Sequence, residues 1–465
     1  MKPSLHPRRR KRLYRLARVT RGHWLRQSLF VLGGVVVGVA AVALAIWGDE
    51  ANKRFHELLT WSRYASFVVT PVGFALAVWL TRRFFPNAQG SGIPQAIAAR
   101  ELKDQKAREP LVSLRVALGK IALTLFGILC GASTGREGPT VQVGASIMYA
   151  AGRLSPRRQP GLILAGSAAG VAAAFNTPLA GVVFAIEEMS RSFEVRTSGV
   201  IIASIIIAGL TSVFFVGNYN YFGVIHASLV GTETWLAVPA CGIFGGLLGG
   251  LFSRFVVAAA HGLPRRIGGH WIQDHPVQFA AACGLAVAVC GYISGDATFG
   301  TGYDQAAHLL TGKGELPWDF GVLKLAATAL STVSGLPGGI FSPSLAVGAG
   351  LGVNVASFFP SQVASAVILL GMVSYFAGVV QAPITAFVIV TEMTDNHDML
   401  LPVMAAALLA HATSRLVCRE GIYHSLSHGF VDAMRAKAAA RSEAEAEAAR
   451  EAEADTPGGA PETRP

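Results

Sequence analysis

Charge is scarce in this sequence. Only 14% of its 465 residues are charged, whereas 52% are hydrophobic, and a soluble domain usually has about 25% charged residues. Long uncharged runs such as residues 30–47 follow one another along the chain. These features exclude a soluble globular protein and predict a helical membrane protein that crosses the bilayer several times.

Cysteine and the common catalytic motifs are also rare or absent. The five cysteines are isolated, have no metal-ligand spacing and are expected to pack in apolar segments: Cys130, Cys241, Cys283, Cys290 and Cys418. The sequence contains no HExxH, no GxSxG elbow and no Walker loop. A membrane-embedded enzyme is therefore disfavoured, as is a purely structural scaffold, and we expect neither a cofactor nor a metal.

Acidic residues are missing from residues 1–26, which contain ten Lys or Arg. Because this basic segment directly precedes a spanning run, the positive-inside rule places the N-terminus in the cytoplasm. A nucleic-acid-binding arm is the alternative, and we expect no nucleic-acid partner. The segment is long for a cleaved signal peptide. The sequence thus predicts a multi-pass protein of the cell inner (plasma) membrane with both termini cytoplasmic.

One stretch, Gly131–Gly144, places an acid deep in an apolar region. A carboxylate such as Glu137 costs about 2.5–3.5 kcal/mol at that depth, so it indicates function. The two glycines beside it permit unusual backbone geometry, and Pro139 suits the first turn of a helix. We predict a helix that begins at Pro139 and directs its N–H groups toward Arg136, Glu137 and a bound anion.

Other interrupted helices flank this stretch. Residues 27–48 and 62–81 are predicted to be two spanning helices joined by a polar link. Residues 90–94 (GSGIP) repeat the pattern of glycines, a hydroxyl and a proline. The Gly/Ala-rich residues 161–189 end in the acidic pair Glu187 and Glu188, for which a solvated helix end, paired with Arg191 and Arg196, is the alternative interpretation.

The chain is duplicated internally. At a shift of 204 residues, Lys120, Gly135 and Pro139 match Lys324, Gly339 and Pro343. At a shift of 205, Glu187 matches Glu392. Interrupted helices at corresponding places in two halves are typical of transporters with a midplane site, and we expect the repeats to be inverted.

The second copy of the central stretch, Gly335–Gly348, carries no acid and offers backbone N–H groups at Ile340 and Phe341. We divide the chain into a basic N-terminus (1–26), a first membrane repeat (27–222), a second membrane repeat (223–426) and a tail (427–465). The tail is Ala/Glu-rich without an apolar face, which predicts a cytoplasmic and largely disordered segment.

Four motifs together resemble the CLC chloride channel and transporter family: GSGIP at 90–94, GREGPTVQVG at 135–144, GGIFSP at 338–343 and Tyr423. The resemblance covers about residues 27–426. It implies an all-α fold of two inverted repeats of tilted and broken helices, in a homodimer with one pore per subunit. The absence of regulatory nucleotide-binding (CBS) domains resembles bacterial members.

The resemblance also assigns roles. It implies that chloride is bound by Ser91, Tyr423 and the backbone of Ile340 and Phe341. It implies that Glu137 is a gate that takes up a proton at an external anion site, where Gly138 and the backbone of Arg136 also lie. The internal proton relay falls on Glu188, with Glu187 beside it.

Those roles favour proton-coupled chloride exchange, and a passive, voltage- or pH-gated chloride channel is the alternative. Ser91 favours chloride over nitrate, and the intact motifs are unlike the fluoride-exporting branch. The chemistry of a buried acid also favours coupled transport. A carboxylate in an anion site is repelled by the anion, so anion occupancy and protonation of the carboxylate are coupled.

Overall fold

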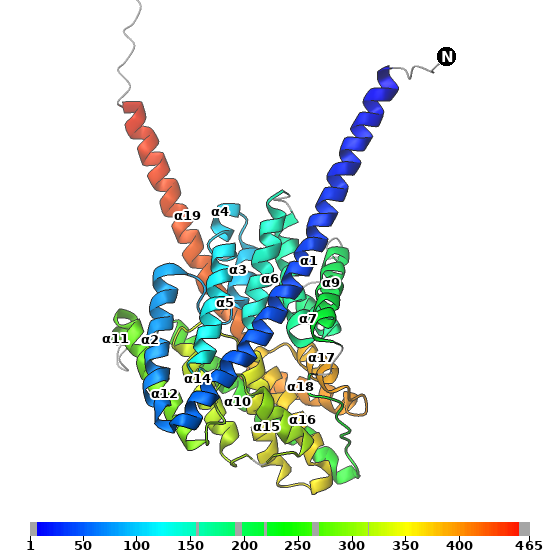
Figure 1. The fold of residues 1–465 in the computed structure, drawn as a ribbon, viewed down its shortest axis with the longest axis vertical. Helices are drawn as coiled ribbons and strands as arrows, with labels where there is room; N and C mark the ends of the chain where they lie inside the picture. The colour runs from blue at the N-terminus through cyan, green and yellow to red at the C-terminus, as the bar shows by residue number, and fades with distance from the viewer. Residues whose placement is uncertain are drawn as a thin grey trace, which may run out of the picture.

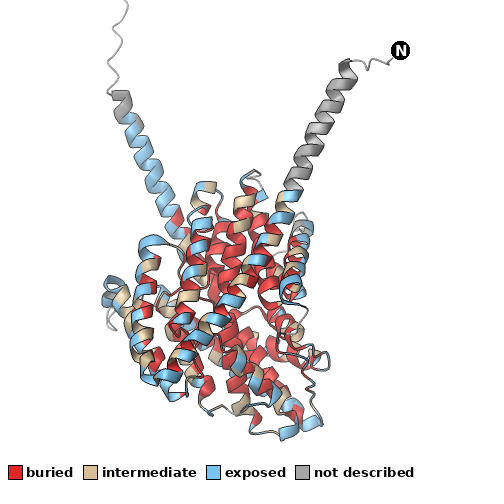
Figure 2. Ribbon diagram, viewed as in Figure 1, coloured by how far each residue is buried: buried red, intermediate tan, exposed pale blue. Residues whose placement is uncertain are grey.

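The computed structural model describes residues 7–154, 158–190, 198–217, 221–262, 269–314 and 316–454. These residues form helices and contain no strand beyond two isolated bridges. Six of the helices are long and apolar enough to cross a membrane. Buried residues fill the middle of the molecule, while exposed ones cover much of its outside (Figure 2). The expected all-helical membrane architecture is confirmed.

The first half of the described chain consists of nine α-helices and a π-helical segment, η4 (Ala185–Ser190). The α-helices are α1 (Pro7–Trp61), α2 (Ser66–Phe84), α3 (Ile93–Glu101), α4 (Gln105–Arg108), α5 (Leu114–Leu129), α6 (Glu137–Ala151), α7 (Gln159–Phe175), α8 (Pro178–Phe184) and α9 (Ser198–Val216).

The second half places the counterparts of α3, α5, α6 and α8 in the same order and adds a terminal helix. Its helices are α10 (Ala237–Ala260), α11 (Gly269–Asp274), α12 (Pro276–Ile293), α13 (Tyr303–Thr311), α14 (Phe320–Val333), α15 (Phe341–Ala356), α16 (Ala364–Val380), α17 (Pro383–Thr394), α18 (Leu400–Val417) and α19 (Ile422–Ala454). The N-terminal end of α1 and the C-terminal end of α19 project from the same side of the molecule (Figure 1).

The polar residues after residue 48, which were predicted to link two helices, do not interrupt the first helix. Helix α1 is continuous from Pro7 to Trp61. Charged residues at this point are compatible with a helix because they pair along it: Arg54 Nε lies 2.6 Å from Glu50 Oε1, one turn away. The separation of 27–48 from the following polar residues was therefore wrong, since polarity marked the end of the apolar run and not the end of the helix.

The prediction of a largely disordered tail from residue 427 is also wrong for most of its length, because α19 continues to Ala454. Alanine, glutamate and arginine are strong helix formers, so this helix needs no apolar face. Arg441 donates to Glu445 at 2.8 Å one turn away, which holds the pKa of Glu445 below its ordinary value. Residues 455–465 lie outside the described residues.

The duplication appears in the structure as a two-fold contact. Gly135 donates its N–H to Gly339 O, and Gly339 donates its N–H to Gly135 O, both at 2.7 Å. These glycines match at the shift of 204 residues, so matched positions exchange identical bonds. Helices α6 and α15, which follow them, extend from the middle of the molecule in opposite directions (Figure 1). The predicted inverted repeats are confirmed.

Two matched glutamates make a second reciprocal contact. Glu187, in η4, accepts hydrogen bonds from Ile384 N at 3.0 Å and Thr385 N at 2.6 Å, at the start of α17. Glu392, in α17, accepts bonds from Leu179 N at 3.1 Å and Ala180 N at 2.8 Å, at the start of α8. Each repeat thus caps a helix of the other, where the N-terminal N–H groups have no partner within their own helix.

We expect Glu187→Gln and Glu392→Gln to destabilise the protein to a similar extent. Each change replaces a charged acceptor by an amide and weakens a helix cap, which typically costs about 1–2 kcal/mol. Thermal unfolding of the purified variants in detergent measures the effect. If either variant unfolds at the parental temperature, the reciprocal caps do not stabilise the repeat interface.

The two buried lysines also make matching bonds. Lys120 Nζ donates to Gly90 O at 2.8 Å, and Lys324 Nζ donates to Gly300 O at 2.7 Å. Gly90 and Gly300 are themselves matched positions in the two repeats. Both lysines therefore hold the glycine-containing turn that precedes a broken helix, which is a structural role.

Candidate functional site

The starts of four helices meet in the middle of the molecule. Three belong to predicted motifs and begin α3, α6 and α15; the fourth begins α19. Besides the Gly135–Gly339 pair, Gly90 N donates to Leu336 O at 3.2 Å and Gly338 N donates to Gly90 O at 3.0 Å. These bonds join the three motif loops directly. Because N-termini of helices attract anions, their meeting point is the candidate anion site.

Glu137 lies at this point. It is the first residue of α6, two residues before the predicted helix start at Pro139, and it is fully buried. Its Oε1 accepts a hydrogen bond of 2.6 Å from Ser342 Oγ in the first turn of α15, whereas its Oε2 has no hydrogen-bond partner among the described residues. The acid of one repeat therefore occupies the helix start of the other.

The glycines on both sides of this acid stand in confined positions. A Cβ atom on Gly135 would collide with Glu137 Oε2 and would lie 3.1 Å from Pro343 Cδ. A Cβ atom on Gly138 would lie 3.0 Å from Ser91 Cβ and 3.2 Å from Gly339 Cα. The two glycines thus leave room for the carboxylate and for the close approach of Ser91.

A cavity of about 510 Å³ lies next to these helix starts, and we call it the vestibule. Its lining includes Ser91, Ile340 and Tyr423, three of the four predicted chloride-binding residues. It also includes Lys437, further along α19, the helix whose C-terminal end projects from the same side as the N-terminal end of α1. The Tyr423 hydroxyl is buried and has no partner among the described residues. The vestibule thus follows α19 from Lys437 to Tyr423, whose hydroxyl is available as a hydrogen-bond donor.

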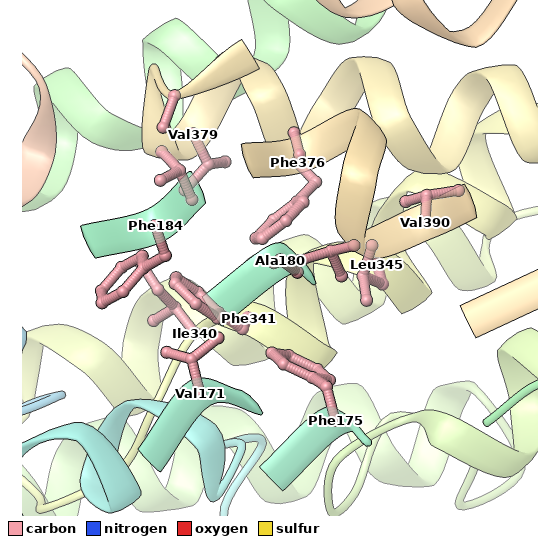
Figure 3. Packing of buried hydrophobic residues seen from close by; sticks show 14 of the residues in the cluster. Val171, Phe175, Ala180, Phe184, Ile340, Phe341, Leu345, Phe376, Val379 and Val390 are labelled. Atoms are coloured by element: carbon pink, nitrogen blue, oxygen red, sulfur yellow. The ribbon is translucent and has the colours of Figure 1, made fainter. Parts of the chain in front are cut away.

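Phe341, the fourth predicted residue, offers only its backbone. Its ring packs in the apolar cluster of Figure 3, 6.0 Å from Phe175, 5.1 Å from Phe376 and 5.9 Å from Tyr423 between ring centroids. This packing fixes the first turn of α15. The N–H groups at such a helix start have no acceptor within their own helix.

Arg136 directs its side chain away from the site. Its Nη1 donates to Ala45 O and to Asp49 Oδ1 on α1, both at 2.5 Å. Its carbonyl accepts from Thr140 N in the first turn of α6 at 3.1 Å. Arg136 therefore anchors the loop to α1, and its positive charge is paired outside the helix starts.

The acidic pair is separated by the fold. Glu187 caps α17 and is only partly buried, whereas Glu188 is buried and its Oε1 lies 3.9 Å from His424 Nε2. The same nitrogen is 2.7 Å from Glu188 O. Because His424 follows Tyr423 on α19, Glu188 lies near the vestibule end of the site. The geometry therefore places Glu188 next to a residue that adjoins the vestibule lining, whereas Glu187 lies at the repeat interface. Arg191 and Arg196 lie outside the described residues.

Two residues of the site were missed by sequence reasoning, Ser342 and His424. Ser342 lies within GGIFSP, and its match in the first repeat is Gly138, so the appearance of a hydroxyl in only one copy was the available signal. His424 directly follows the predicted Tyr423, and no spacing in the sequence relates it to Glu188. The contact of Ser342 with Glu137 joins the two repeats, and the contact of His424 with Glu188 joins the last helix to the first repeat.

Comparison with known proteins identifies the family of this chain. The family model described as voltage gated chloride channel matches residues 73–415. The chain belongs to this family. The H(+)/Cl(-) exchange transporter ClcA of Yersinia pestis bv. Antiqua (strain Angola) is 32% identical, over 84% of this chain and 85% of the relative. ClcA of Citrobacter koseri is 30% identical, over 92% of this chain and 96% of the relative.

Solved structures of the family share the fold. A slow cyanobacterial Cl⁻/H⁺ antiporter matches with a TM-score of 0.75 and 23% identity, over 92% of this chain and 99% of that one. A CLC-type fluoride/proton antiporter matches with a TM-score of 0.72 and 22% identity, over 86% of this chain and 97% of that one. At such identities, these matches bear on the fold alone.

Proposed function

We propose that this member of the voltage gated chloride channel family exchanges chloride for protons across the inner membrane. One observation carries the proposal: the fully buried Glu137 carboxylate lies at the start of α15, where an anion would bind. The ClcA relatives, named H(+)/Cl(-) exchange transporters, support the choice of ions. The protein is accordingly a transporter and not an enzyme.

Competition for one position couples the two ions. An ionised Glu137 holds the helix start and repels chloride, whereas a protonated Glu137 loses the attraction of the helix dipole and can leave. Chloride then enters from the vestibule past Ser91 and Tyr423 and meets the N–H groups of Ile340 and Phe341. Hydroxyl and amide donors without a contacting cation bind the anion weakly enough to release it.

Protons reach the gate by a different route. Glu188 is buried beside His424, the residue after Tyr423 on α19, and in this proposal it accepts protons from the cytoplasmic side before they pass to Glu137. Glu187 takes no part in the transfer, because its carboxylate is held by the start of α17. We therefore expect Glu187→Gln to keep the proton-to-chloride ratio of the parent in the flux assay below, although it lowers stability.

Simultaneous chloride and proton flux from purified protein in liposomes tests the proposal. With a chloride gradient imposed, an exchanger moves protons uphill until the gradient collapses. A passive chloride channel of the same family, the alternative function, carries chloride without moving protons. If chloride crosses the membrane and no protons move at any chloride gradient, the protein is a passive channel and the proposal of exchange is wrong.

The assembly and orientation are part of the same proposal. Large apolar side chains are exposed on α9 and α18, among them Phe214, Leu401 and Leu416, and they suit lipid or a second copy of the chain. We propose a homodimer with one pore per subunit, which subunit counting in bilayers can test. The shared side of both chain ends and the basic residues 1–26 support cytoplasmic termini.

A further inference from the structure

Ser342 is the residue that holds the gate in its observed position. Its hydroxyl donates to Glu137 Oε1 at 2.6 Å, and both side chains are buried. The other carboxylate oxygen has no hydrogen-bond partner among the described residues. A buried carboxylate needs a donor to offset its lost hydration, and a short bond to an ionised acceptor is of the strong, charge-assisted kind.

The position of Oε1 also identifies where an anion would sit. A halide, like a carboxylate oxygen, is negative and accepts hydrogen bonds without donating them. If Glu137 swings away, the Ser342 hydroxyl is left buried at a helix start without its acceptor, which is unfavourable. An anion that arrives at this position satisfies both the hydroxyl and the helix dipole.

Only the second repeat has this hydroxyl donor, as the matching position in the first repeat shows. Ser342 corresponds to Gly138 at the shift of 204 residues, and a Cβ atom on Gly138 would be tightly confined by Ser91 and Gly339, at 3.0–3.2 Å. A hydroxyl is therefore present on the α15 side, whereas the α6 side has a glycine in a tight place. The asymmetry adds a hydroxyl donor at the gate, separate from those of Ser91 and Tyr423 at the vestibule.

We propose that Ser342 is a shared donor of the outer anion site, which binds the gate carboxylate when the gate is closed and a halide when it is open. The inference rests on the proposed role of Glu137 as the gate. The Ser342 hydroxyl then stabilises the closed position of the Glu137 carboxylate and also contributes to the affinity of the outer site for halide.

The first test uses Ser342→Ala in the otherwise unchanged full-length protein. Without the hydroxyl, the ionised gate is held less firmly, so chloride turnover in liposomes at neutral and higher external pH rises. From the usual strength of hydrogen bonds to charged groups, we expect the pH profile of turnover to move upward by about one pH unit or more. An unchanged profile overturns the proposal.

Ser344→Ala is the matched control. Ser344 lies two residues further along α15, is also buried, and its hydroxyl has no partner among the described residues. The Ser344→Ala variant loses the same atom, a hydroxyl oxygen, from the same helix. We expect the pH profile of its chloride turnover to equal that of the parent. An equal shift in both variants would mean that any hydroxyl lost from α15 has this effect, and would overturn the specific role of Ser342.

The second test removes the gate. In a Glu137→Ala background, chloride titration by calorimetry compares proteins with and without Ser342→Ala. We expect about tenfold weaker chloride binding when the hydroxyl is absent, and a lost bromide signal at the outer site in crystals. Equal affinity and equal bromide occupancy overturn the shared role, even if the pH profile had moved.

These tests separate the inference from the function on which it rests. If the Glu137→Ala protein still drives protons uphill, the gate assignment fails and the role of Ser342 fails with it. If Glu137→Ala is uncoupled but Ser342→Ala changes neither the pH profile nor the affinity, the gate stands and the inference alone is wrong.

Discussion

Replacing Glu137 with glutamine is expected to reduce proton movement to the level of empty vesicles while chloride still crosses. Glutamine keeps the shape of the side chain, and its carbonyl oxygen can still accept from Ser342 Oγ, which bonds Glu137 Oε1 in the parent. The glutamine side chain carries no charge and does not take up a proton at the pH values of a flux assay. The gate would therefore resemble its protonated form permanently, and the two fluxes would separate.

The measurement is the paired flux assay with a chloride gradient as the only driving force. Glu109→Gln is a suitable control, because it makes the same chemical change at an exposed carboxylate that pairs with Arg153 on the surface. The control should keep the parental ratio of protons to chloride. Uphill proton movement in Glu137→Gln at the parental rate would contradict the gate assignment.

The sequence was sufficient to place this acid, and the reason is local. Gly135, Gly138 and Pro139 each restrict what the backbone can do, so a helix start at the depth of an apolar run could be inferred without knowing its surroundings. The same logic located residues 90–94 and 338–343. The internal match at 204 residues then implied that these loops meet, which the Gly135–Gly339 bonds confirm.

What the sequence could not supply is the direction in which neighbouring residues face. Glu187 and Glu188 are adjacent and chemically identical, yet one reaches the start of α17 and the other lies beside His424. Their destinations depend on the π-helical geometry of η4 and on helices about 200 residues away. Likewise, the polar residues after position 48 gave no sign that α1 would continue through them.

Glu188→Gln is the second change with a large expected effect, and its neighbour is the ideal comparison. We expect it to bring proton flux close to background while chloride transport continues, because the amide keeps the packing next to His424 but cannot relay a proton. Unlike the gate variant, Glu188→Gln leaves an ionisable Glu137 at the outer site. Chloride flux in this variant should therefore still depend on external pH, whereas in Glu137→Gln it should not.

Glu187→Gln makes the identical substitution one residue earlier. If proximity to the pathway decides the role, Glu188→Gln loses coupling with little change in unfolding temperature, and Glu187→Gln loses stability with its coupling intact. The reverse pattern, or equal uncoupling by both, would show that protons pass through the interface between η4 and α17. Since the two side chains differ only in what the fold places against them, the pair tests the structure as directly as it tests the mechanism.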